Sequence, residues 1–165
     1  MTSFGPKHLS YSRLSAAAAA LAALLVCDSA APAWAEQTKL PPPTTVRHDH
    51  SMTAGIPAAY RYRRNPLRRS PQTLDKGRRL YGEHCLACHG PFGLGDGEMV
   101  ADLDVRPPSL LYLQAGGVTA DDYAYWAIAE GGAPLGTPMP AFKDVLDDAA
   151  IWSLITYLKA GLPEY

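Results

Sequence analysis

The chain has 165 residues, 47% of them apolar and 19% charged, which suits one packed domain with flanking segments. Its formal net charge of −1 gives no basis for binding to nucleic acid. Three cysteines are too few for a disulfide scaffold.

The first 35 residues have the pattern of an export signal. Lys7 and Arg13 form a basic start, residues 14–26 form an apolar run, and Ala33-Trp34-Ala35 matches the small-x-small pattern of a cleavage site. We therefore expect residues 1–35 to be a signal peptide, cleaved after Ala35, and the mature protein to be periplasmic. The alternative is an uncleaved membrane anchor, although the apolar run is shorter than the roughly 20 residues that a spanning helix needs.

Residues 36–71 are predicted to be a Pro/Arg-rich extension that is largely irregular, because no apolar period is sustained along them. Residues 60–69 contain five arginines, two tyrosines and a leucine, a composition that suggests contact with another surface. This basic arm is either a solvated tether or a segment that lies on its own domain or on an acidic partner. His48 and His50 form only a weak metal-binding pattern.

Charge is unevenly distributed along the chain. Residues 36–91 hold ten Lys/Arg and four Asp/Glu, whereas residues 92–165 hold three Lys/Arg and eleven Asp/Glu. The split predicts faces of opposite sign, which would influence docking more than folding.

Three helices are predicted in the remainder of the chain, residues 72–165, and no strand-like alternation is present. The first begins at Ser70, has apolar positions at three- and four-residue spacing, and ends at Cys85. The second begins with Thr119 as its N-cap and stops at Gly131-Gly132. The third runs from about residue 147 to residue 160. Gly/Pro-rich loops at 90–97, 107–108 and 131–140 separate them, so the expected fold class is all-α.

The sequence Cys85-Leu86-Ala87-Cys88-His89 is a C-x-x-C-H motif, the pattern of c-type haem attachment. Two thiols at this spacing can each form a thioether with one haem vinyl group, and His89 can then bind the iron. A thioredoxin-like redox motif would need a βαβ context, and a zinc site would need a second Cys/His pair. Neither is found, so we expect one covalently bound haem c.

A second axial ligand is expected to be Met139, because Pro138 and Pro140 restrict the backbone on both sides of it. The other methionines available after the signal are Met52, in the extension, and Met99, in an acidic loop. The remaining alternatives are an open site or a histidine ligand from the set His48, His50 and His84.

These residues resemble the class I c-type cytochromes over roughly 74–162. Gly77 and Tyr81 match the Gly-x-x-x-aromatic pattern of that family's first helix, and Trp152 and Tyr157 fall on the last helix, where an aromatic packs against that glycine. The resemblance implies a cytochrome c-like fold, with three main helices and long loops around one haem.

The same resemblance covers Pro108-Ser109-Leu110, which is similar to the family's Pro-Asn-Leu. It implies that the Pro108 carbonyl accepts a hydrogen bond from His89 and orients the imidazole. Ser109 stands where the family has Asn, and Pro107 is an alternative acceptor.

The expected function is one-electron transfer between a redox donor and an acceptor, as in a respiratory chain. We expect no catalytic residue and therefore an electron carrier that is not itself an enzyme. It would act alone or as the cytochrome subunit of a larger, membrane-bound oxidoreductase docked through residues 61–69. The alternative is a haem sensor or small haem peroxidase in which Met139 dissociates.

Overall fold

The computed structural model describes residues 43–111 and 121–162, together with Met1. In these ranges the chain forms helices and loops, and its only β feature is an isolated parallel bridge between Pro43 and Arg106. The all-α prediction is therefore confirmed for the described residues. The predicted signal and its cleavage site, and the predicted N-cap Thr119, lie outside them.

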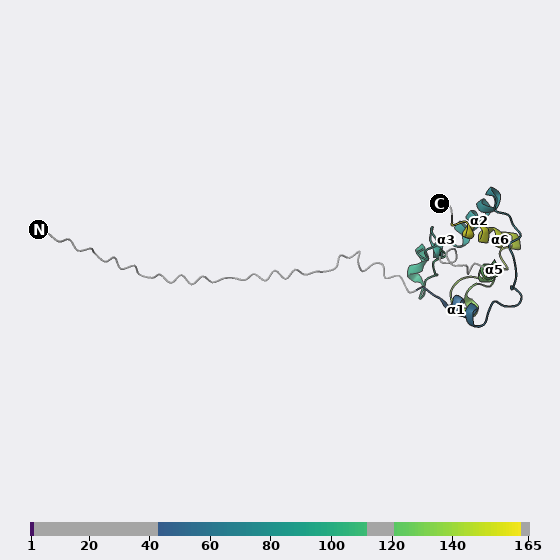
Figure 1. Cartoon of the computed structure of the whole chain (residues 1–165), viewed down its shortest axis with the longest axis horizontal. Coiled ribbons are helices and arrows are strands. Elements are labelled where there is room, and N and C mark those ends of the chain that lie inside the picture. The colour runs from purple at the N-terminus through teal and green to yellow at the C-terminus, as the bar shows by residue number, and fades with distance from the viewer. Residues whose placement is uncertain (2–42, 112–120, 163–165) are drawn as a thin grey trace. The chain divides into compact units, whose positions relative to one another are not determined.

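Within the described ranges, seven helical segments follow one another, and Figure 1 labels the α-helices among them. Four are α-helices of eight residues or more, and three are short α or 3₁₀ turns. They are α1 (Val46–Thr53), α2 (Pro71–His84), α3 (Leu86–His89), η2 (Glu98–Asp102), α5 (Asp121–Glu130), η3 (Ala133–Leu135) and α6 (Asp148–Lys159). None of these helices is long and apolar enough to cross a membrane.

The bounds of α2 and α6 follow from local capping chemistry. The Ser70 hydroxyl accepts a hydrogen bond from the Thr73 amide at 3.1 Å, and Pro71 occupies the first helical position, where its missing N–H costs nothing. At α6, an Asp147 carboxylate oxygen accepts from the Ala150 amide at 2.6 Å. Both predicted helices are confirmed to within one or two residues.

Helix α6 is the centre of the core, since every residue from 150 to 157 is buried. Helix α2 crosses it at Gly77, where an added Cβ would lie only 2.6 Å from the Tyr157 Cβ. The Tyr81 and Tyr157 rings lie 5.8 Å apart beside this crossing. The predicted contact between the glycine and a last-helix aromatic is thus made by Tyr157, while Trp152 packs 4.6 Å from Tyr125 of α5.

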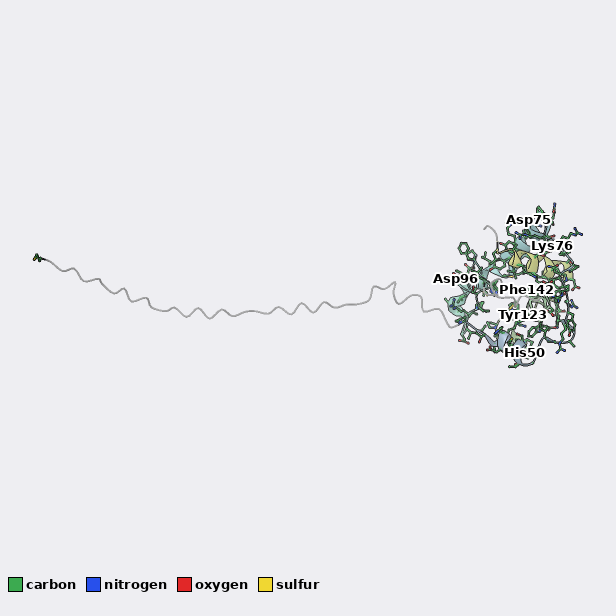
Figure 2. The ribbon with its side chains drawn as sticks, viewed as in Figure 1. His50, Asp75, Lys76, Asp96, Tyr123 and Phe142 are labelled. Carbon is green, nitrogen blue, oxygen red and sulfur yellow. The ribbon has the colours of Figure 1, made fainter. Side chains whose placement is uncertain are left out.

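Residues 43–69, which we call the strap, lie against α5 and α6. The Asn65 side-chain amide donates to the Thr156 hydroxyl at 2.9 Å and to the Trp152 carbonyl at 3.2 Å. The Asn65 backbone amide donates to the Asp121 carboxylate at 2.9 Å. The strap also contains α1, a helix the sequence did not predict. Figure 2 shows His50 of α1 at the lower edge of the domain, below Tyr123 of α5 and Phe142.

Candidate haem site

The C-x-x-C-H motif occupies a single helical turn directly after α2. Cys85 is the last residue of the α2 region, and α3 follows, with the His89 amide donating to the Cys85 carbonyl at 2.8 Å. This turn places both thiols and the imidazole on one short segment. Cys85 and Cys88 are free cysteines and half-buried, so both remain available for thioether formation.

The surroundings of His89 favour its neutral form, which is the form that binds iron. Burial lowers its pKa to about 4, so the imidazole is neutral at pH 7. Its Nδ1 is buried without a hydrogen-bond partner, although the residue as a whole keeps part of its surface exposed. Burial likewise raises the pKa of the Cys85 thiol to about 12, with the neighbouring Cys88 adding to the effect.

The glycine-rich loop at 90–97 packs closely on this turn. The Gly95 amide donates to the His89 carbonyl at 3.0 Å, and the Gly97 amide donates to the Cys88 carbonyl at 3.3 Å. The buried Tyr81 hydroxyl donates to the Gly90 carbonyl at 2.6 Å, which ties the loop to α2. The loop therefore supports the motif through its backbone, as a structural element.

Pro107 and Pro108 come after that loop in the sequence, and the Pro107 carbonyl packs against it. The Pro107 carbonyl faces Gly95, at a spacing that leaves no room for a side chain there, and Pro108 is exposed. The hydrogen bond expected from His89 to Pro108 is not formed, since Nδ1 has no partner in the structure. The orienting role of Pro108 stays a prediction.

Met139 is the methionine best placed among the described candidates. It is half-buried and packs against the same core cluster that Cys85 borders. Met99 and Met52 are 49% and 72% exposed. The structure thus brings Met139 and the first cysteine to the edge of one core and leaves the other two methionines facing solvent.

The three alternative histidines are placed as follows. The His50 ring lies 5.7 Å from Trp126, and the His84 ring lies 5.6 Å from Phe142 in an edge-on contact. His48 is half-buried in α1. Among the described residues, no three His, Cys, Asp or Glu side chains gather into a metal-binding group.

Two strap residues contact the end of α5, where the Met139 segment begins, and the sequence pointed to only one of them, as a tyrosine of the 60–69 arm. Arg47 donates to the Gly131 carbonyl, and the Tyr60 hydroxyl donates to the Glu130 carboxylate. No periodicity points to Arg47. The alternation of tyrosine and arginine after residue 59 was the only available signal for Tyr60.

The residues present fit a covalently bound haem. Two reduced thiols and a neutral imidazole share one turn at the edge of an apolar core, and thiols, imidazole and thioether are the donor set of c-type haem. Cys85 and Cys88 would hold the porphyrin, and His89 and Met139 would bind the iron.

The fold has a counterpart among solved structures. It is similar to a chain of the Kuenenia stuttgartiensis reducing HAO-like protein complex, with 28% sequence identity and a TM-score of 0.50. The match covers 62% of this chain and 53% of that chain, so this chain spans about half of its length. No curated protein matches the sequence.

The family comparison covers more than half of the chain. Residues 72–158 match the family described as "Cytochrome C oxidase, cbb3-type, subunit III". The matched range contains the C-x-x-C-H turn, Met139 and all but one residue of each of α2 and α6. The chain therefore belongs to this family of c-type cytochromes.

Proposed function

We propose that the protein is an exported monohaem cytochrome that passes single electrons between redox proteins. The observation that carries the proposal is the Cys85–His89 turn, with its neutral imidazole, at the edge of the same core that Met139 borders. A haem c bound there supplies a one-electron ferric/ferrous couple, and His/Met ligation raises its potential.

The chain's own residues would hold this centre and keep water from it. Two thioethers from Cys85 and Cys88 would make the attachment irreversible, and His89 and Met139 would fill the two axial positions. The apolar core cluster would cover the porphyrin, which favours the less charged reduced state. Export with cleavage after Ala35 belongs to the proposal, and N-terminal sequencing of the mature protein should then begin at Glu36.

The first test is whether the haem is covalently attached to the chain. Acid–acetone treatment of the denatured protein should leave the haem on the chain, and its pyridine haemochrome should show both vinyl groups saturated. Cys88→Ala should lower the yield of haem-bearing protein sharply. Haem that extracts fully from the wild-type chain would refute the attachment.

The second test concerns the ligand. Ferric protein should show the near-infrared sulfur–iron charge-transfer band, and Met139→Ala should abolish it. Met99→Ala is the matched control because Met99 is the more exposed methionine. Loss of the band in Met99→Ala with retention in Met139→Ala would reassign the ligand.

The partner is proposed to be an oxidoreductase with an acidic docking face. Four of the five arginines at 61–69, namely Arg61, Arg64, Arg68 and Arg69, are exposed. Arg63 is instead turned inward, over the Tyr125 ring at 4.4 Å. The similar chain from Kuenenia stuttgartiensis is part of a protein complex, which supports a subunit role.

Charge reversal tests the docking face. Arg68→Glu with Arg69→Glu should slow electron transfer to the native partner and weaken its salt dependence, because exposed charges steer association. Arg79→Glu, on the exposed side of α2 and outside the arm, is the control. Equal slowing by the control would show that the arm has no special role.

A further inference from the structure

Residues 131–140, which we call the Met139 loop, are closed at their two ends by main-chain hydrogen bonds, and we call this closed base the neck of the loop. The Gly132 amide donates to the Met139 carbonyl at 2.7 Å. The Gly132 carbonyl accepts from the amides of Leu135, at 2.8 Å, and Thr137, at 3.0 Å. One residue, Gly132, therefore closes the loop and directly holds the backbone of Met139.

The peptide group that makes this bond has a glycine on each side. Its carbonyl belongs to Gly131 and its N–H to Gly132, and Gly131 has a φ of +61°. Glycines resist rotation of a peptide plane least, because they lack a Cβ. A flip of this plane would aim the N–H away from Met139, so a contact that holds the Gly131 carbonyl in place also holds the bond from Gly132 to Met139.

Arg47 of the strap provides that constraint. Its Nη2 donates to the Gly131 carbonyl, the opposite end of the same peptide group. The guanidinium lies 4.4 Å from the centre of the Trp126 ring, and its Nη1 is buried without a partner. The bond is thus charge-assisted and largely shielded from competing water, and it polarises the N–H that Gly132 gives to Met139.

A second contact between the strap and this segment lies one residue earlier, at Glu130. Glu130 accepts a hydrogen bond from the Tyr60 hydroxyl of the strap. It also forms an ion pair with Lys143, at 2.9 Å. Lys143 follows the loop in the chain, and its amide donates to the Ala129 carbonyl at 3.2 Å. The strap therefore contacts the end of α5 at two consecutive residues, on the segment where the Met139 loop begins.

We propose that Arg47 is a positioning residue for Met139, acting through the peptide between Gly131 and Gly132. The proposal rests on the proposed function, in which the Met139 sulfur is an axial ligand. It gives the N-terminal strap a role in the redox site that is separate from docking. Without the guanidinium, the Met139 loop would open more readily, and the Met139 sulfur would then dissociate more readily from a haem iron bound at this site.

The test compares ligand exchange in the ferric holoprotein with imidazole as the entering ligand. Arg47→Ala should raise the rate of imidazole binding about tenfold or more, because it removes a charge-assisted hydrogen bond that favours the closed loop. It should also lower the reduction potential and speed hydrogen exchange at the Gly132 amide. Arg47→Gln, which keeps a donor without the charge, should lie between wild type and Arg47→Ala and serves if the alanine variant does not fold.

Arg61→Ala is the matched control. Arg61 is an exposed strap arginine whose Nε donates to the nearby Ile56 carbonyl, and this variant should match wild type in imidazole binding, reduction potential and Gly132 exchange. If Arg47→Ala and Arg47→Gln lower the melting temperature but leave imidazole binding, potential and Gly132 exchange unchanged, the inference is wrong and Arg47 only fastens the strap.

Met139→Ala separates this inference from the proposed function. It should lose the sulfur–iron band and bind imidazole without a loop-opening step. If the band persists in Met139→Ala, the ligand assignment fails. Exchange at the Gly132 amide in Arg47→Ala then still decides whether Arg47 orders the loop.

Discussion

Gly77→Ala tests the crossing of α2 and α6 most directly. A Cβ at position 77 would lie 2.6 Å from the Tyr157 Cβ, and closer still to the Ser153 carbonyl oxygen. Carbon atoms in contact normally lie about 3.5–4.0 Å apart, so the overlap is roughly 1 Å. Both obstructing atoms are fixed to α6, and no side-chain rotation can move them. The helices must separate.

The change in the free energy of unfolding caused by Gly77→Ala is the difference between two opposing effects. Alanine is favoured over glycine inside a helix by about 1 kcal/mol, which alone would stabilise α2. Overpacking of a close helix contact costs about 1–3 kcal/mol, and here the forced separation also disturbs the Tyr81–Tyr157 contact. Because no side-chain rotation relieves the overlap, we take the upper end of that cost, about 3 kcal/mol, and expect a net loss of about 2 kcal/mol. This loss corresponds to a fall in melting temperature of roughly 6–8 °C.

Thermal and urea unfolding, followed by tryptophan fluorescence, measure this loss. Gly136→Ala is the control, because an added Cβ there meets no atom within 4 Å and only the positive φ of 70° opposes it. It should cost about 1 kcal/mol without moving α2. A Gly77→Ala variant as stable as wild type, or more stable, would refute the close crossing.

Three further predictions concern the strap and the motif. Deleting residues 43–69 should lower the melting temperature by roughly 10 °C, since several hydrogen bonds worth about 1 kcal/mol each are lost, and an unchanged melting curve would contradict the strap contacts. The pKa of Tyr60 is raised to about 12, by burial first and then by Glu130, so the folded state keeps this proton longer than the unfolded chain. Stability should therefore fall as pH rises from about 10 to about 12, and less steeply in Tyr60→Phe, as urea midpoints across this range would show. Tyr81→Phe should cost about 1–3 kcal/mol by leaving the buried Gly90 carbonyl without its donor, measurable by urea unfolding, whereas Tyr62→Phe at an exposed position should be neutral.

Much of the haem domain could be predicted because its signals are local. Ser70 with Pro71, and Asp147 before a run of apolar residues, mark helix starts by capping chemistry that depends only on neighbouring residues. The C-x-x-C-H motif is likewise read from five consecutive residues. The all-α class followed from these elements and from the absence of alternating patterns.

Packing of residues 60–69 on their own domain was one of the alternatives that the sequence left open, but the helix and the individual contacts of the strap could not be predicted, because they depend on distant residues. Helix α1 has only eight residues, none of them fully buried, and is too short to be stable by itself. Its neighbours are Trp126 and Gly131, about 80 residues further along the chain. The segment expected to be largely irregular is therefore partly helical, and one arginine of the expected docking arm, Arg63, lies over aromatic rings of its own domain.

The bonds at the neck of the Met139 loop run almost entirely through main-chain atoms. Arg47 binds a carbonyl, and Gly132 binds carbonyl and amide groups, so none of these bonds requires a particular side chain at Ala133, Leu135 or Pro138. Substitutions at Ala133 and Leu135 that keep the backbone conformation would therefore leave these bonds in place, whereas Pro138 also restricts the backbone next to Met139. An evolving or engineered form of this chain can thus change its side chains at positions 133 and 135 without breaking the hydrogen bonds that close the loop.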